Sequence, residues 1–210
     1  MRTKTLLCAA GALAASLAVS SAQTVYSANV VGYVNVPITG GQYALLANPL
    51  DNGTNTLSSL FPNAPVGSTI LVWTGTGYQS SGMGFGGTWS TNLVITPGEG
   101  FFANMASTIT NTFVGNVAVA PGSSVTTPFS AGVYALVGSP IPYSDTLSGT
   151  NLNLQLGTGS TILVWTGSGF QSSGVGFGGT WSTNLTITPG EGFFVNSATA
   201  TNWVQTFQTQ

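Results

Sequence analysis

Short stretches of alternating apolar and polar residues recur along most of the chain, together with short runs of β-branched residues. Val34–Val36 and Val117–Val119 show the alternation. Thr69–Trp73 and Thr161–Trp165 have the length and composition of buried strands. Because such stretches recur roughly every 8–15 residues, the pattern favours a sandwich or a barrel over alternating strands and helices. The sequence therefore predicts an all-β fold.

Glycine and proline mark the turns between these predicted strands. Thr74–Gly77 predicts a tight hairpin connection, since glycine supplies the positive φ that such turns need. Gly82–Gly87 predicts a second chain reversal or a bulge. Thr96–Gly100 has proline and glycine at the two central positions of a type II turn. The helix candidate in the first half of the chain is Thr56–Phe61, which has Asn55 or Thr56 as its cap and Pro62 after its end.

A long internal repeat determines the architecture. Ser68–Asn104 returns 92 positions later as Ser160–Asn196, with 32 of its 37 positions identical. A repeat at a fixed spacing implies that any site in one copy should exist twice. The five differences are Thr76/Ser168, Tyr78/Phe170, Met83/Val175, Val94/Thr186 and Ala103/Val195.

The likeness between the two copies extends beyond this block. Gly41–Leu45 matches Gly132–Leu136. Further towards the N-terminus, Val31–Val34 is matched with Val114–Val117, which leaves extra residues around Pro121–Pro128 in the second copy. Each copy then has the size of a small domain.

The N-terminus has the layout of a secretory signal. Arg2 and Lys4 precede the apolar stretch Leu6–Val19, and small residues up to Ala22 provide a cleavage site. The apolar stretch is shorter than the roughly 20 residues of a membrane-spanning helix, and no later stretch approaches that length. Residues 1–22 are therefore predicted to be the signal peptide, and two tandem β-sandwich or barrel-like modules follow at 23–111 and 112–210. We expect the protein to be extracellular or at the cell surface, with the periplasm as the alternative.

The distribution of charge narrows the possible chemistry. The chain has two basic residues and one cysteine, all inside the predicted signal peptide, and it has no histidine. Without basic side chains the mature chain lacks the electrostatic footprint of a nucleic-acid-binding protein. Nucleophilic sites that need His, Cys or Lys are excluded, and so are metal sites made from His or Cys. We predict no cofactor and no metal, and we expect the chain not to be an enzyme.

Among the four carboxylates, Glu99 and Glu191 are the pair that the repeat places at equivalent positions. A glycosidase needs two carboxylates on either side of one bond, and these two meet only if the modules pack about a pseudo-twofold axis. A calcium site made from one Glu and several carbonyl oxygens is a second alternative. We favour a third, in which each Glu lies in an exposed turn or accepts backbone N–H bonds.

Aromatic residues give the positive indication of recognition. Each copy carries four of them among neutral Ser, Thr, Asn and Gln: Trp73, Tyr78, Phe85 and Trp89, and then Trp165, Phe170, Phe177 and Trp181. Exposed rings in such surroundings bind neutral sugars, whereas buried rings fill the core of a small β module. Trp73 and Trp165 end apolar strands, so we expect them in the core. We also favour the core for Trp89 and Trp181, but because Thr and Ser bracket these two, they remain candidates for ligand binding. The candidate ligand-binding residues are Tyr78, Trp89, Glu99, Phe170, Trp181 and Glu191.

Three short motifs occur in the same order in both copies. Gly-x-Tyr-Ala-Leu is followed by Trp-Thr-Gly-x-Gly-Tyr/Phe and then by Pro-Gly-Glu-Gly-Phe-Phe. This order resembles a β-rich module of secreted and surface proteins from environmental bacteria, although Tyr-Ala-Leu stands where that pattern often has Trp-Asn-Leu. The resemblance implies an uncharacterised, non-enzymatic family without catalytic residues to transfer.

Two hypotheses about function follow, in different classes. The first is a secreted non-enzymatic structural or surface-interaction protein, whose uncharged strand edges suit association with itself or with other surface proteins. The second is a bivalent carbohydrate-binding protein, in which two equivalent sites for neutral polysaccharide gain avidity. An enzyme and a membrane-associated protein are the remaining alternatives.

Overall fold

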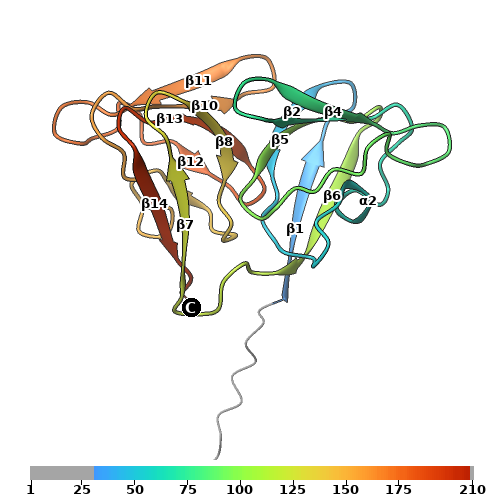
Figure 1. The fold of residues 1–210 in the computed structure, drawn as a ribbon, viewed down its shortest axis with the longest axis horizontal. Helices are drawn as coiled ribbons and strands as arrows, with labels where there is room; N and C mark the ends of the chain where they lie inside the picture. The colour runs from blue at the N-terminus through green and yellow to red at the C-terminus, as the bar shows by residue number, and fades with distance from the viewer. Residues whose placement is uncertain (1–30, 209–210) are drawn as a thin grey trace, which may run out of the picture.

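The structure is a computed structural model that describes residues 31–208, so the predicted signal peptide lies outside the described residues. Figure 1 shows two units next to each other, with unit 1 in blue to green and unit 2 in yellow to red. Within the described range the only helix is α2 (Leu57–Leu60), and the other regular elements are strands. The all-β prediction is therefore confirmed. No helix in this range has the length and apolar character needed to cross a membrane.

Unit 1 consists of a four-stranded antiparallel sheet and a two-stranded ribbon. The sheet has the order β2 (Tyr43–Ala47), β5 (Gly100–Asn104), β3 (Thr69–Trp73), β4 (Tyr78–Gly82). The ribbon pairs β1 (Val31–Ile38) with β6 (Ile109–Asn116), in a register that runs from Val31 opposite Asn116 to Ile38 opposite Ile109.

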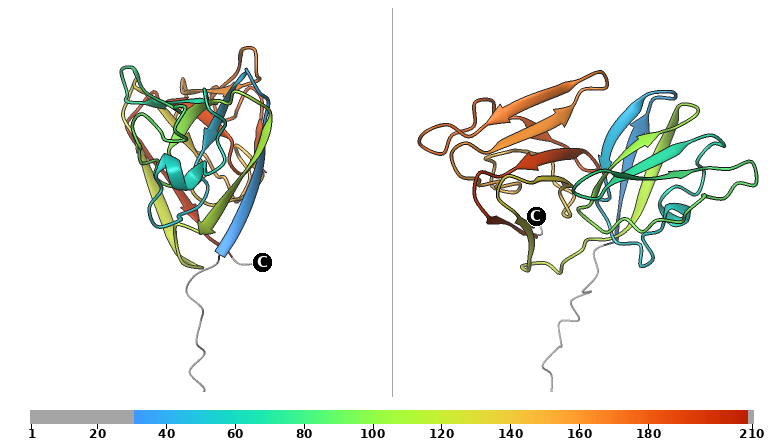
Figure 2. Two further views of the ribbon diagram at one scale, coloured as in Figure 1. Left: turned by 90° about the vertical axis from the view of Figure 1, so that its right-hand side faces the viewer. Right: turned by 45° about the horizontal axis from the view of Figure 1, so that its top comes forward.

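Unit 2 repeats this arrangement. Its sheet has the order β8 (Tyr134–Gly138), β13 (Gly192–Asn196), β10 (Thr161–Trp165), β11 (Phe170–Gly174). Its ribbon pairs β7 (Ser124–Phe129) with β14 (Thr201–Thr206), and a short pair joins β9 (Asp145–Thr146) to β12 (Thr186–Ile187). In Figures 1 and 2 the two ribbons leave their sheets towards the same side and approach each other where the linking segment runs.

Strand pairing corrects the alignment of the two copies. β1 and β7 hold the same place in the two ribbons, so matching Val31–Val34 with Val114–Val117 is wrong. Much of the segment around Pro121–Pro128, interpreted as extra residues, belongs to β7. Short valine-containing strands resemble one another in their alternation of apolar and polar residues, and this similarity led to the mismatch. The predicted boundary between residues 111 and 112 falls inside β6, and strand pairing divides the units after Asn116.

Three local predictions are confirmed. The predicted helix Thr56–Phe61 corresponds to α2, with Thr56 as N-cap and Phe61 as C-cap. The hairpin at Thr74–Gly77 is closed by a bond of 2.9 Å from the Thr74 N–H to the Gly77 carbonyl. The chain also reverses within the predicted glycine-rich segment, where the Gly84 N–H donates to the Thr88 carbonyl at 2.9 Å.

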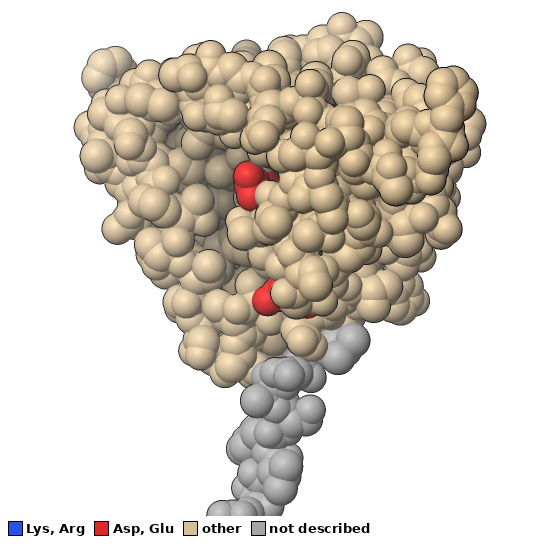
Figure 3. All heavy atoms as spheres, turned by 45° about the vertical axis from the view of Figure 1, so that its right-hand side comes forward, with Lys and Arg blue, Asp and Glu red and all other residues tan. Residues whose placement is uncertain are grey.

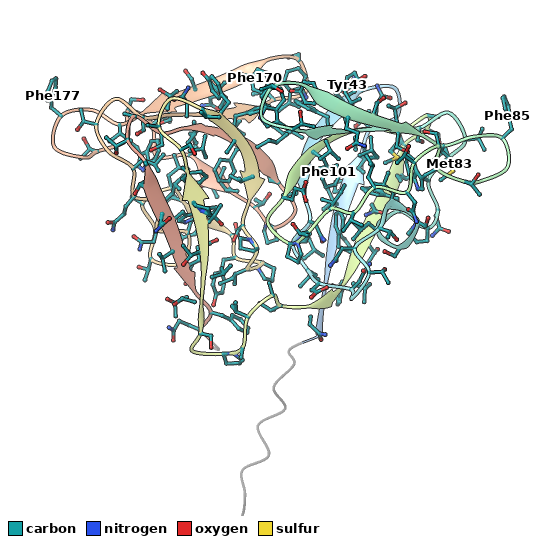
Figure 4. All side chains as sticks on the ribbon, viewed as in Figure 1. Tyr43, Met83, Phe85, Phe101, Phe170 and Phe177 are labelled. Carbon is teal, nitrogen blue, oxygen red and sulfur yellow. The ribbon has the colours of Figure 1, made fainter. Side chains whose placement is uncertain are left out.

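The core of each unit lies between the ribbon and the inner face of the sheet. Successive side chains of a strand point to opposite faces, so Ile70 and Val72 of β3 point inwards and are buried. Phe61 packs edge-on against Phe101 of the sheet and Phe113 of the ribbon, with ring centroids 5.7 Å apart in both pairs. Figure 4 shows Phe101 in the interior of unit 1. The sheet and the ribbon are thereby joined through aromatic contacts.

The two cores differ where the repeat is least similar. Asn111 of β6 donates from Nδ2 to the carbonyl of Leu60 at 3.1 Å. At the equivalent place in β14, Trp203 is fully buried and donates from Nε1 to the carbonyl of Leu152 at 2.6 Å. Trp203 thus fills space in the core of unit 2, which has no counterpart of helix α2 among the described residues.

Candidate functional site

Two tryptophans of the repeat join the units to each other. Trp73 donates from Nε1 to the carbonyl of Tyr134 at 2.9 Å, and Trp165 donates in the same way to the carbonyl of Tyr43 at 2.7 Å. Each bond runs from one unit to the other, and the two donors are equivalent in the repeat, as are the two acceptors. The reciprocity means that the units are related by a pseudo-twofold axis.

Backbone hydrogen bonds follow the same symmetry. The Ala47 N–H donates to the Gly190 carbonyl at 2.9 Å, and the Gly138 N–H donates to the Gly98 carbonyl at 3.0 Å. Gly98 has φ of +83° and the Glu99 N–H bonds back to Thr96, as the predicted type II turn requires. The Pro-Gly-Glu turn of each unit therefore covers the edge strand, β2 or β8, of the other unit.

Between these bonds lies an apolar cluster shared by the units. Leu45, Phe102, Leu136 and Phe194 are buried there, and the half-buried Trp73 and Trp165 pack against them. The expectation that these two tryptophans lie in the cores of the modules is wrong. Ile70 and Val72 point inwards, so the alternation directs Trp73 to the outer face of its sheet, which the other unit covers. A strand pattern alone does not reveal that a second unit covers this face.

The outer faces of the two sheets together form an aromatic face. It consists of eight rings, four from each unit: Tyr43, Trp73, Tyr78, Phe102, Tyr134, Trp165, Phe170 and Phe194. Trp73 meets Tyr78 at 5.0 Å and Trp165 meets Phe170 at 4.9 Å, both edge-on, as aromatic pairs prefer. Four rings remain 41–46% exposed after the units pack: Tyr43, Tyr78, Tyr134 and Phe170.

Two apolar hollows open on the aromatic face. The first has a volume of about 180 Å³ and is lined by Tyr43, Leu71, Tyr78, Phe102 and Trp165. The second has a volume of about 230 Å³ and is lined by Trp73, Tyr78, Tyr134, Leu163, Phe170 and Phe194. The pseudo-twofold exchanges the two sets of residues, except that Tyr78 borders both hollows. The candidate site is therefore duplicated, as the repeat predicts, but the two copies adjoin each other at the junction between the units.

The aromatic face carries no charge. The described residues contain no Lys or Arg, and on the side shown in Figure 3 acidic atoms occupy only small areas. Partial burial raises the pKa of the Tyr78 hydroxyl above its ordinary value of 10.0. Tyr78 is consequently neutral at physiological pH, and a ligand of this face has to be recognised without ion pairs.

Each repeated glutamate is bound by its own turn. Glu99 Oε2 accepts bonds from the Thr96 N–H at 2.9 Å and from the Thr96 hydroxyl at 3.2 Å. Glu191 Oε2 accepts the same two bonds from Thr188, both at 3.0 Å. The pseudo-twofold packing that a shared carboxylate site requires is present, yet both carboxylates serve the turns that dock the units. No group of three or more metal-ligating side chains occurs among residues 31–208.

Trp89 and Trp181 lie away from the aromatic face and differ from each other. Trp89 is 7% exposed and packs edge-on against Phe61 in the core of unit 1, with a centroid distance of 6.5 Å. Trp181 is half-buried and borders a separate, more polar hollow together with Leu154 and Gly179. Burial prevents Trp89 from acting as a binding platform, so the pair does not provide equivalent sites.

Of the six candidate residues, Tyr78 and Phe170 are the two that lie on the aromatic face. The sequence interpretation missed Tyr43, Tyr134, Phe102 and Phe194. A signal for them was present, because Gly-x-Tyr-Ala-Leu and Gly-Phe-Phe occur in both copies. Which of these rings remain exposed depends on the docking of the units, and this could not be read from strand patterns.

Comparison with known proteins gives no match: no family model, no curated protein and no solved structure is significantly similar to the chain. The resemblance to β-rich modules of secreted proteins stays a prediction. A functional assignment therefore rests on the geometry and chemistry of the aromatic face.

Proposed function

We propose that this chain is a secreted, non-enzymatic surface-interaction protein in which two duplicated β units present one uncharged aromatic face to a partner. One observation carries the proposal: a single cluster of rings runs across both units, and four of those rings are more than 40% exposed. Contiguous exposed apolar surface on a soluble protein usually marks a site of interaction.

Docking of the units accounts for only part of this face. Trp73, Trp165 and the four buried residues of the shared cluster hold the units together. The outward parts of Tyr78 and Phe170 contribute less to that contact, since both side chains are 46% exposed. Their exposure is better explained by a partner that covers them in the assembled state.

The chemistry of the face supports binding rather than catalysis. Tyr78 is replaced by Phe170 in the second copy, so a function common to both copies does not depend on the phenol group. The repeated carboxylates, Glu99 and Glu191, accept hydrogen bonds from Thr96 and Thr188 in their own turns. Apolar contact and edge-on aromatic packing are the interactions that the face offers.

Binding of neutral polysaccharide is the second candidate function, and the two hollows favour it. Equivalent hollows in the two units match the bivalent arrangement through which weak sites gain avidity. Ser80 and Ser172, exposed on the edge strands β4 and β11, follow Tyr78 and Phe170 at the spacing that puts them on the same face. Their hydroxyls supply neutral hydrogen-bonding groups beside the rings.

The experiment compares residues 23–210, the chain without the predicted signal peptide, with a Tyr78→Ala/Phe170→Ala double variant of the same residues. Self-association is followed by light scattering over a concentration series, and carbohydrate binding by affinity electrophoresis in gels of neutral polysaccharide. Tyr33→Ala, which removes an exposed ring on β1, is the matched control. Circular dichroism verifies that all three proteins are folded.

Loss of self-association or of polysaccharide retardation in the double variant, but not in the control, supports the proposal. The arm in which the loss occurs distinguishes the two candidate functions. A wild-type chain that does neither, or a double variant that behaves like the wild type, overturns the proposal.

A further inference from the structure

Two phenylalanines outside the aromatic face are almost completely exposed. Phe85 is 100% exposed and Phe177 is 97% exposed. They occupy equivalent positions in the glycine-rich loops of the two units, and Figure 4 shows them at opposite ends of the molecule. Neither ring takes part in a core or in the docking of the units.

The loops that carry these rings are closed by backbone hydrogen bonds. The Gly84 N–H donates to the Thr88 carbonyl, and the Gly176 N–H donates to the Thr180 carbonyl, both at 2.9 Å. Gly87 and Gly179 return the chain by bonding to the carbonyls of Gly84 and Gly176, at 3.0 and 3.1 Å. Each loop therefore has a defined reversal that holds its phenylalanine away from the body of its unit.

The hollows of the aromatic face have the size and polarity of a phenyl-binding site. An enclosed apolar cavity of about 150 Å³ is large enough to bind benzene. The two hollows measure about 180 and 230 Å³ and are open to the surface, so each has room for a ring that enters from outside and stays covered on one side only. They are lined by leucine and aromatic side chains, which accept a further ring edge-on. Neither the hollows nor the loops carry a charge that would oppose contact between two copies.

We propose that Phe85 and Phe177 of one copy insert into the aromatic hollows of neighbouring copies, so that the protein assembles with itself. The inference rests on the proposed function, because it names a second copy of this chain as the partner of the aromatic face. Insertion within one molecule is ruled out, since the rings lie at the ends of the molecule while the labelled Tyr43 and Phe170 of the face lie midway between them (Figure 4).

The number of contact points determines the kind of assembly. Each chain has two protruding phenyl groups and two hollows. Contacts between two different surfaces produce an open assembly, unless the rotation from one copy to the next closes the assembly into a circle. The expected product is an extended filament or layer. Burial of one phenyl ring is worth roughly a ten- to hundredfold increase in an association constant. A single contact is thus weak, and assembly requires several contacts and high concentration.

The experiment uses residues 23–210, the chain without the predicted signal peptide, and three double variants of it. Phe85→Ala/Phe177→Ala removes the protruding rings and leaves the hollows intact. Leu71→Phe/Leu163→Phe fills the hollows and leaves the protruding rings intact, and Tyr78→Ala/Phe170→Ala is a second hollow variant in case the first does not fold. Tyr33→Ala is the control. Sedimentation velocity gives the size distribution and negative-stain micrographs give the form of the assemblies.

The wild type and the control are expected to form extended assemblies as concentration rises. Each double variant alone is expected to associate at least roughly tenfold more weakly. An equimolar mixture of the ring variant and a hollow variant is expected to form mixed assemblies in which the two variants alternate, because one supplies two hollows and the other supplies two rings.

Three outcomes overturn the inference. The wild type remains a monomer; the Phe85→Ala/Phe177→Ala variant assembles like the wild type; or the wild type binds vesicles of phosphatidylcholine through these phenylalanines without self-association. The proposed function is tested separately by Tyr78→Ala/Phe170→Ala and the polysaccharide arm. Assembly that depends on Tyr78 and Phe170 but not on Phe85 and Phe177 would leave the proposed function standing and reject only this inference.

Discussion

Trp73 in unit 1 donates its indole N–H to the backbone carbonyl of Tyr134 in unit 2, across 2.9 Å. The duplication supplies the reciprocal bond, so the same pair of residues is used twice at one junction. A motif that looks like the core of a small β module is in fact the means by which two such modules dock. The docking also collects rings from both units into one face, which is where we place the function.

Replacement of both docking tryptophans by phenylalanine is predicted to weaken the junction. The Trp73→Phe/Trp165→Phe variant loses two hydrogen bonds, each worth about 1 kcal/mol, and some packing in the shared apolar cluster. We expect a lower free energy of unfolding, and separate transitions for the two units in denaturant titrations followed by circular dichroism. Trp181→Phe, a change at a half-buried tryptophan inside unit 2, is the control and should keep one transition. A double variant as stable and as cooperative as the wild type would contradict this role.

Stability is predicted to depend on Asp145 at acid pH. Hydrogen bonds from the Asn151 and Thr146 backbone N–H groups hold the pKa of Asp145 below its ordinary value of 3.8. Because the pKa is lower in the folded than in the unfolded state, the ionised carboxylate stabilises the folded protein above about pH 3.8. This contribution is lost as the pH falls through the folded-state pKa. Asp145→Asn should therefore reduce stability at pH 7 and have a smaller effect at about pH 3. Urea midpoints at both pH values test this, and an equal effect at both would refute it.

Tyr78 is predicted to contribute an alkaline dependence. Partial burial raises the pKa of Tyr78 in the folded state, so the contribution of Tyr78 to stability is constant below about pH 10, its ordinary pKa, and is lost as pH rises through the folded pKa. Tyr78→Phe introduces the residue type that unit 2 carries at the equivalent position. The variant should show a smaller fall in stability between about pH 9 and 11. Thermal midpoints across this range provide the measurement. If stability falls just as steeply at alkaline pH in the variant, another tyrosine causes the fall.

Much of the fold follows from local chemistry. The short strands, a helix within Thr56–Phe61 and the Gly98 turn were predicted because each depends on residues that are adjacent in the chain. The equivalence of β1 and β7 was missed, because the ribbons are the part of the repeat in which the sequences have diverged most. Pairing between β1 and β6 joins residues far apart in sequence, and alternation alone does not specify such a partner.

The candidate site was predicted only in part, for a related reason. Tyr78 and Phe170 were identified as candidates, and so was the neutrality of the repeat, since both follow from residue types. Tyr43, Phe102 and their counterparts in unit 2 were not identified. The position of Trp73 at the junction depends on which face of its strand the second unit covers. That choice is made by long-range packing, which no single stretch of this sequence records.

The central claim is that the two units dock about a pseudo-twofold axis, and Ala47 and Gly138 test it most directly. They are equivalent in the repeat, and a Cβ added at Gly138 would overlap the Cβ of Ala47 in the other unit and would also lie 2.7 Å from the backbone carbonyl oxygen of Glu191 in its own unit. Gly138→Ala should therefore cost about 1–3 kcal/mol through overpacking. Ala47→Gly alone should cost less than about 1 kcal/mol.

The decisive measurement is the free energy of unfolding of the wild type, both single variants and the Ala47→Gly/Gly138→Ala double variant. Docking as described predicts that the double variant recovers the part of the Gly138→Ala loss that comes from overlap with Ala47, with a coupling energy of at least about 1 kcal/mol, while the contact with the Glu191 carbonyl remains. Additive losses in the double variant, or a Gly138→Ala variant as stable as the wild type, would contradict the account.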